Sequence, residues 1–110
     1  MKAVALVPPT FANASDRRAW NHALLSFEKY RANPSDIRDR AIRMIAKWQQ
    51  QNICSVWYQE RWSYLLSLPI DEAEAIVMAP TDEGQMLRAS IPIAGVFSQE
   101  ELSFIQTNVS

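Results

Sequence analysis

The side chains that most often carry out chemistry are scarce in this chain. Its 110 residues include one cysteine, Cys54, and one histidine, His22. A structural zinc site takes four ligands, mostly Cys and His at short spacings, and the sequence has no C-x-x-C or H-x-x-x-H pattern. We therefore expect no metal site, no cofactor and no Cys–His catalytic pair. Cys54 is predicted to be a small buried apolar side chain, as free cysteines commonly are.

Carboxylates are the other candidates for catalysis, and they occur in three clusters: Asp71, Glu72 and Glu74; Asp82 and Glu83; Glu100 and Glu101. Each cluster lies at a predicted helix start, where acids stabilise the positive end of the helix dipole. Two carboxylates acting as general acid and base would need perturbed pKa values within a cleft, and no pattern in the sequence marks such a pair. The glycine-rich motifs of nucleotide-binding loops are absent as well. We expect no catalytic activity, and a small enzyme that uses an acid cluster is kept only as the second alternative.

The candidates for nucleic-acid binding are four basic residues of one predicted helix: Arg38, Arg40, Arg43 and Lys47. Residues 16–47 hold eight basic side chains against four acidic ones, while residues 71–101 hold seven acids against one arginine. Such polarity can indicate a nucleic-acid face, a partner of complementary charge or internal pairing. Two features argue against nucleic acid: the pI is about 5.8, and the next predicted helix, 54–67, is too apolar to lie in a groove. A nucleic-acid-binding regulator is therefore the first alternative.

Aromatic residues favour a third class of function, protein–protein interaction. Four tryptophans are a high number for a chain of this length, and we expect three of them in the core: Trp20, Trp48 and Trp57. The fourth, Trp62, is expected at the margin of the apolar arc of helix 54–67, where Trp, Tyr and Arg neighbours are typical of interface hot spots. The predicted partner-binding residues are Tyr58, Arg61, Trp62 and Leu66. We thus favour a non-catalytic adaptor or regulatory protein that binds a protein partner or a second copy of itself.

Composition predicts the scaffold that positions these residues. Two glycines in the whole chain are far below the usual share of about 7%, and turn-rich β proteins depend on glycine for positive φ. We predict a single compact all-α domain over residues 14–110, with five or six helices around a central Trp/Tyr/Leu-rich helix at 54–67. Residues 1–13, which contain a Pro-Pro pair, are predicted to form an extended N-terminal arm.

Capping residues set the expected helix boundaries. The first helix should begin at Ser15 and end near Ala32, and the second should begin at Pro34, because proline suits the first helical position. Capping-box patterns of the kind D-x-x-E or S-x-x-E predict helix starts at Asp71 and Ser98. A further short helix is expected over 82–89, capped by Thr81 and weakened by Gly84. Residues 91–97, with Pro92 and Gly95, are predicted to form a buried irregular loop.

The N-terminus has an apolar run, Ala3–Val7, that is shorter than the hydrophobic region of a secretory signal. No apolar stretch of the sequence approaches the length of a membrane span. We therefore expect a cytoplasmic protein that does not bind a membrane.

Overall fold

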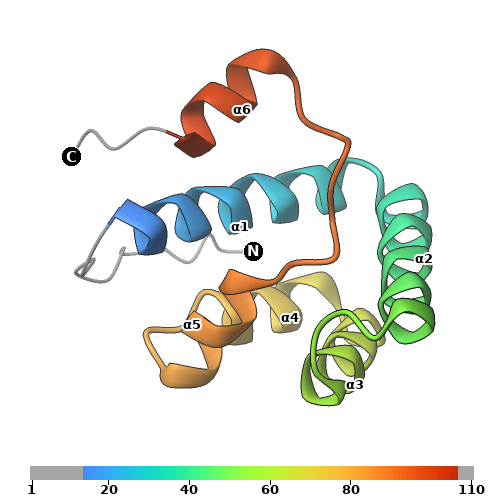
Figure 1. The fold of residues 1–110 in the computed structure, drawn as a ribbon. Coiled ribbons are helices and arrows are strands. Elements are labelled where there is room, and N and C mark those ends of the chain that lie inside the picture. The colour runs from blue at the N-terminus through green and yellow to red at the C-terminus, as the bar shows by residue number, and fades with distance from the viewer. Residues whose placement is uncertain (1–13, 107–110) are drawn as a thin grey trace.

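The chain folds into helices joined by short connections, apart from the longer segment 90–98 that precedes the last helix (Figure 1). A computed structural model describes residues 14–106, which contain no strand and form six helices: α1 (Ala14–Ala32), α2 (Pro34–Gln51), α3 (Val56–Leu66), α4 (Ile70–Val77), α5 (Asp82–Ala89) and α6 (Gln99–Gln106). The predicted all-α architecture is confirmed. The arm expected at residues 1–13, and the last four residues of the predicted domain, lie outside the described residues.

Three of the six helix starts follow from residues next to them in the sequence. The second helix begins at Pro34, as predicted. Thr81 Oγ1 accepts a hydrogen bond from the Gly84 amide at the start of α5. At α6 the capping box is complete, because the Glu101 amide donates to Ser98 Oγ and the Ser98 amide donates to Glu101 Oε1, at 3.1 and 2.8 Å. These three starts were predictable because each depends on residues within one turn.

Two helix starts differ from the prediction. Helix α1 already includes Ala14, so the expected cap Ser15 lies inside the helix. Helix α4 begins at Ile70, one residue before the predicted cap Asp71. The Asp71 side chain bonds Arg31 of α1 instead of capping its own helix. A long-range ion pair has taken the place of the local capping bond.

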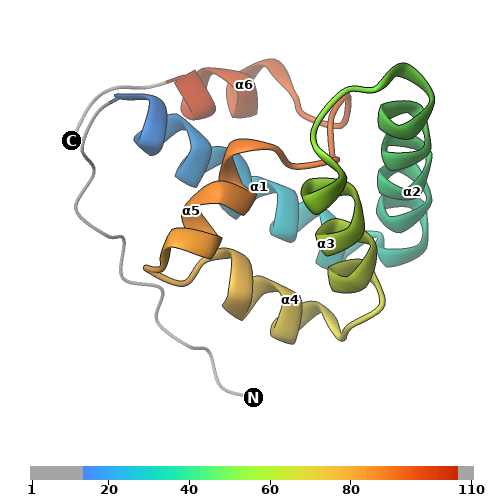
Figure 2. The same ribbon diagram turned by 60° about the horizontal axis from the view of Figure 1, so that its bottom comes forward.

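Helix α1 is the element with the most helix neighbours. It packs against α2, α4, α5 and α6, whereas α3 packs against α2 and α4. Both views place α6 on the opposite side of α1 from α4 and α5 (Figures 1 and 2). The prediction that helix 54–67 is the centre of the fold is therefore not confirmed. Its observed span is also shorter, Val56–Leu66.

The hydrophobic core lies between α1 and the layer formed by α2 to α5. We call the residues that α1 contributes the core side of α1: Trp20, Ala23, Phe27 and Tyr30. Their spacing of three and four residues is that of one helical face. Trp48 of α2 and Trp62 of α3 join the same cluster. The chain after α5 is irregular and buries Ile91 and Ile93, as predicted for this loop.

The corner between α4 and α5 depends on a glycine and a buried arginine. A Cβ atom on Gly84 would lie 2.4 Å from the Ala79 carbonyl oxygen, so only glycine allows this close approach. Arg88 is 7% exposed, and its Nη1 donates to the carbonyls of Val77 and Ala79 at 2.7 and 3.0 Å. Its guanidinium also lies 5.3 Å from the centre of the Trp20 ring. Burial lowers the pKa of Arg88, and the charge of Asp16 partly opposes this.

Among residues 14–106, none of the helices combines the length and the apolar composition that crossing a bilayer would require.

Candidate protein-binding surface

The connection between α2 and α3 is a fixed turn rather than a loose loop. Asn52 and Cys54 both adopt positive φ, 55° and 64°, which side chains other than glycine rarely do. The buried Gln59 holds this conformation, because its Nε2 donates to the carbonyls of Ile53 and Cys54 at 3.3 and 3.4 Å. The turn determines which side of α3 faces the core. It also leaves Ile53 and Val56 44% and 61% exposed.

Two aromatic side chains are also exposed on the outer side of α3. Trp57 and Tyr64, seven residues apart on one helical face, are 39% and 49% exposed. Arg61 lies between them, with its guanidinium 5.0 Å from the centre of the Tyr64 ring. The Arg61 Nε also donates to Glu83 of α5. We define the α3 surface as Ile53, Val56, Trp57, Arg61 and Tyr64.

Of the four predicted partner-binding residues, Arg61 is part of this surface. Tyr58 is half-buried. Its ring packs edge to face against the Trp57 ring, with 5.0 Å between the two ring centroids. Trp62 and Leu66 are 2% and 4% exposed. The expectation that these two lie at a surface margin is wrong, and neither can contact a partner while the domain is folded.

The burial of Trp57 and Trp62 is therefore the reverse of the sequence prediction. Trp62 belongs to the inner side of α3 with Leu65 and Leu66, at the i, i+3, i+4 spacing of a buried face. Trp57, expected in the core, is exposed. The i, i+3, i+4 spacing of these residues could have identified the inner side of α3 from the sequence. The positive φ angles of the turn at residues 52–55 could not have been inferred, because the sequence has no glycine there.

The four basic candidates for nucleic-acid binding, Arg38, Arg40, Arg43 and Lys47, are all exposed on α2. Helical geometry places Arg40, Arg43 and Lys47 along one flank and Arg38 on the other. Arg40 Nε is 3.0 Å from Asp36 Oδ2, an i, i+4 ion pair. The structure thus brings three of the four together, and nucleic-acid binding by this flank stays a prediction.

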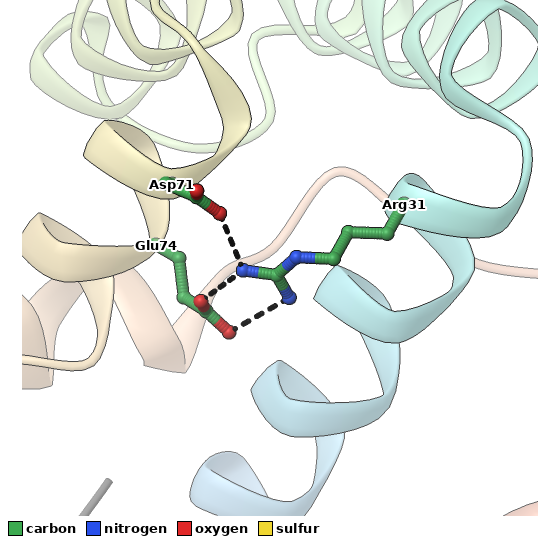
Figure 3. Close-up of polar contacts among 3 residues, drawn as sticks. All are labelled: Arg31, Asp71 and Glu74. Atoms are coloured by element: carbon green, nitrogen blue, oxygen red, sulfur yellow. Dashed lines mark hydrogen bonds and ion pairs between the residues drawn. The ribbon is translucent and has the colours of Figure 1, made fainter. Parts of the chain in front are cut away.

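Two acids of the α4 cluster, Asp71 and Glu74, bind an arginine of α1 (Figure 3). Arg31 Nη2 lies 2.9 Å from Asp71 Oδ1, and Nη1 donates to Glu74 Oε2 at 3.2 Å. A second bond joins Nη2 to Glu74 Oε1. The bonds to Glu74 and Asp71 raise the pKa of Arg31, so this residue is a permanent cation. The contact joins the end of α1 to the start of α4.

The other two acid clusters also contribute to ion pairs between helices. Glu83 accepts from Arg61, and Glu101 Oε2 lies 2.9 Å from Lys29 Nζ. Each of these contacts fixes the position of one helix on another. Among residues 14–106 no group of three or more His, Cys, Asp or Glu side chains is placed to hold a metal ion.

The single histidine and cysteine have separate surroundings. His22 is half-buried on α1, with its Nε2 3.2 Å from the Ile93 carbonyl oxygen. Cys54 lies in the α2–α3 turn, partly buried against the core, which is close to its predicted role as an apolar side chain. Neither side chain belongs to the α3 surface.

No protein-family description, no curated protein and no solved structure matches this chain.

Proposed function

We propose that this chain acts by binding a protein partner through the α3 surface, without catalysis and without a cofactor. The observation that supports the proposal is the exposure of Trp57 and Tyr64 on one face of α3. Apolar residues exposed singly are normal on a soluble protein, but a group rimmed by polar residues is typical of an interaction site. The cytoplasmic location expected from the sequence is part of this proposal.

The composition of the surface supports binding by a few strong contacts. Trp, Tyr and Arg are the residues most enriched in interface hot spots, and the α3 surface contains one of each. Val56 and Ile53 extend it with aliphatic area at the start of the helix.

The surface is also preorganised, which lowers the entropic cost of binding. Arg61 is held from two directions, by the Tyr64 ring and by the Glu83 carboxylate. The Gln59 side chain fixes the backbone of the turn that carries Ile53. A partner would therefore meet side chains that already have one conformation.

The test is a pull-down from a lysate of the source cells with tagged protein, with and without nuclease, together with light scattering of the purified protein. The test variant is the double change Trp57→Ala and Tyr64→Ala. The matched control, Met86→Ala with Phe104→Ala, removes two apolar side chains of similar exposure from α5 and α6. Truncating a hot-spot residue costs about 2 kcal/mol or more, roughly a thirty-fold loss of affinity.

We expect the test variant to lose a nuclease-resistant partner, or a self-association seen by light scattering, while its thermal unfolding is unchanged. The control should bind as the unaltered chain does. Equal capture by both variants would contradict the proposal. Captured protein that disappears with nuclease would instead support the alternative, a nucleic-acid-binding regulator that uses Arg40, Arg43 and Lys47.

A further inference from the structure

The side of α1 that faces α6 is polar, in contrast to its core side. We call it the α6 side of α1 and define it by Asn21, His22, Ser26 and Lys29. The apolar Leu25, on the same side, is half-buried. The Ser26 hydroxyl is buried and has no hydrogen-bond partner among residues 14–106. A buried hydroxyl without a partner is unfavourable, so this interface has been assembled with an energetic defect.

Few side chains of α6 are buried on this side. Ile105 is the only buried residue of the helix, and Leu102 and Phe104 remain 40% and 45% exposed. Asn21 Nδ2 donates to the Phe104 carbonyl at 3.2 Å, and the Lys29–Glu101 ion pair is at the surface. Exposed ion pairs contribute little to stability. Helix α6 is thus held by one buried apolar side chain, one amide and one ion pair, whereas the core side of α1 is packed with apolar side chains.

The chain leading to α6 has a natural hinge. Ile91 and Ile93 are buried and anchor its first part in the core. The next two residues, Ala94 and Gly95, are exposed. Gly95 has φ +76° and no atom within 4 Å of a Cβ built on it. Rotation at this point would lift Val96 and Phe97 from the edge of the core cluster and leave the two isoleucines in place.

His22 contacts the chain on both sides of this hinge. Its Nε2 contacts the Ile93 carbonyl, and the Phe97 ring meets it edge to face at a centroid distance of 5.3 Å. We propose that α6 together with residues 96 and 97 forms a strap that detaches from α1 when His22 is protonated. This strap is independent of the α3 surface and of the function proposed for it.

The charges around His22 do not favour an imidazolium in the docked state. Its own helix contributes Arg18 one turn before and Lys29 two turns after it. The segment 90–98 has no titratable side chain. On α6 the acids are Glu100, which is exposed, and Glu101, which bonds Lys29 and Ser98.

Burial lowers the pKa of His22 below its ordinary value, although the Ile93 carbonyl partly offsets this. Opening the strap restores water and an ordinary pKa of about 6.5. Docking is therefore favoured in full above that pH and weakens as the pH falls below it, through the lower pKa of the docked state. One proton of this kind can raise the open population by up to about tenfold between pH 7.5 and 5.5.

The test is hydrogen exchange of the full chain, followed by mass spectrometry and expressed as protection factors at pH 7.5 and 5.5. We expect protection of residues 96–106 to fall by up to about tenfold at pH 5.5, with α2 to α5 unchanged. His22→Gln, whose amide can donate to the same carbonyl but cannot titrate, should remove this pH response. Asn21→Ala should loosen α6 by the same factor at both pH values.

Three results would overturn the proposal: unchanged protection of α6, loss of protection in all helices together, or an equal pH response in His22→Gln. An NMR titration of the single histidine in the unaltered chain gives a check that needs no variant. A pKa below 6.5 supports the strap, and a pKa at or above 6.5 overturns it.

Discussion

The two sides of α1 are built from different kinds of residue. The core side presents Trp20, Ala23, Phe27 and Tyr30, each at most 4% exposed, to the layer formed by α2, α4 and α5. The α6 side instead has the amide of Asn21, the imidazole of His22, the hydroxyl of Ser26 and the ammonium group of Lys29. Within residues 14–106 that hydroxyl has no hydrogen-bond partner. One helix thus has one interface like a protein interior and another like the polar contact between separable domains.

The difference teaches where the stability of the domain is located. Apolar burial stabilises by about 25 cal/mol for each Å² removed from water, whereas a typical hydrogen bond contributes only about 1 kcal/mol net. The core side should therefore unfold with the whole domain. The α6 side should open locally, at a lower free energy, as weakly packed elements do. Matched substitutions on the two sides can break or sharpen this distinction.

The largest expected effect is that of a core truncation. Phe27 is 1% exposed, and Phe→Ala changes at such sites cost about 3–5 kcal/mol. We expect Phe27→Ala to lower the midpoint of urea unfolding for the whole chain. Its counterpart Ile105→Ala removes the single buried side chain of α6. It should increase hydrogen exchange in α6 and leave the unfolding midpoint close to that of the unaltered chain.

Equal midpoint losses in these two variants would mean that α6 is part of the cooperative core. The comparison between the sides would then fail, and the strap would fail with it.

The second effect concerns a cation on each side of α1. Arg88, which packs over Trp20 of the core side, donates to two carbonyls at the end of α4. Hydrogen bonds from a charged group are worth about 1.5–3 kcal/mol, so Arg88→Met should lower the unfolding midpoint by a comparable free energy. Lys29→Met removes only a surface ion pair, and we expect no change that thermal unfolding can resolve.

Arg88→Lys provides the control for charge alone. It keeps a cation, but its side chain is shorter and has no guanidinium plane to pack over the Trp20 ring. An Arg88→Met variant as stable as the unaltered chain would show that the corner between α4 and α5 is held by other contacts.

The sequence predicted the features of this fold that depend on neighbouring residues. Helix starts at Pro34 and Ser98 and the irregular course of segment 91–97 could all be inferred, because capping and helix breaking act within one turn. The predicted burial of that segment holds for residues 91–93, whereas Ala94 and Gly95 are exposed. The ion pair of Asp71 with Arg31 could not be inferred, because it joins residues far apart in the chain. Local spacing therefore predicts that Asp71 caps its own helix.

The candidate site was harder to predict than the fold. Which tryptophan of α3 is exposed depends on the rotation of the helix about its axis. That rotation is set by the positive φ angles of Asn52 and Cys54 and by the bonds from Gln59 to this turn. Asn adopts such angles more readily than most residues, but Cys does not. The surface proposed from the structure therefore lies on the same helix as the sequence prediction, but of the four predicted residues it retains Arg61 alone.

The two glycines give the smallest and most selective comparison. In Gly84→Ala the new Cβ would meet the carbonyls of Ala79 and Ile76 at 2.4 and 3.2 Å, so α5 must move away from α4. Overpacking of this kind costs about 1–3 kcal/mol, against a gain in helix propensity of at most about 1 kcal/mol. We expect a net loss of global stability in urea unfolding. In Gly95→Ala nothing is touched, and the cost is the positive φ alone, about 1 kcal/mol.

That conformational cost falls on the hinge and not on the core. Gly95→Ala should therefore leave the urea midpoint unchanged and alter only the exchange of residues 96–106. A Gly95→Ala variant whose midpoint falls as far as that of Gly84→Ala would couple the hinge to the core side of α1. Separate effects would show that the chain beyond Gly95 folds onto α1 as a unit of its own, because each substitution adds one methyl group and the strain arises at the α4–α5 corner in Gly84→Ala but at the hinge in Gly95→Ala.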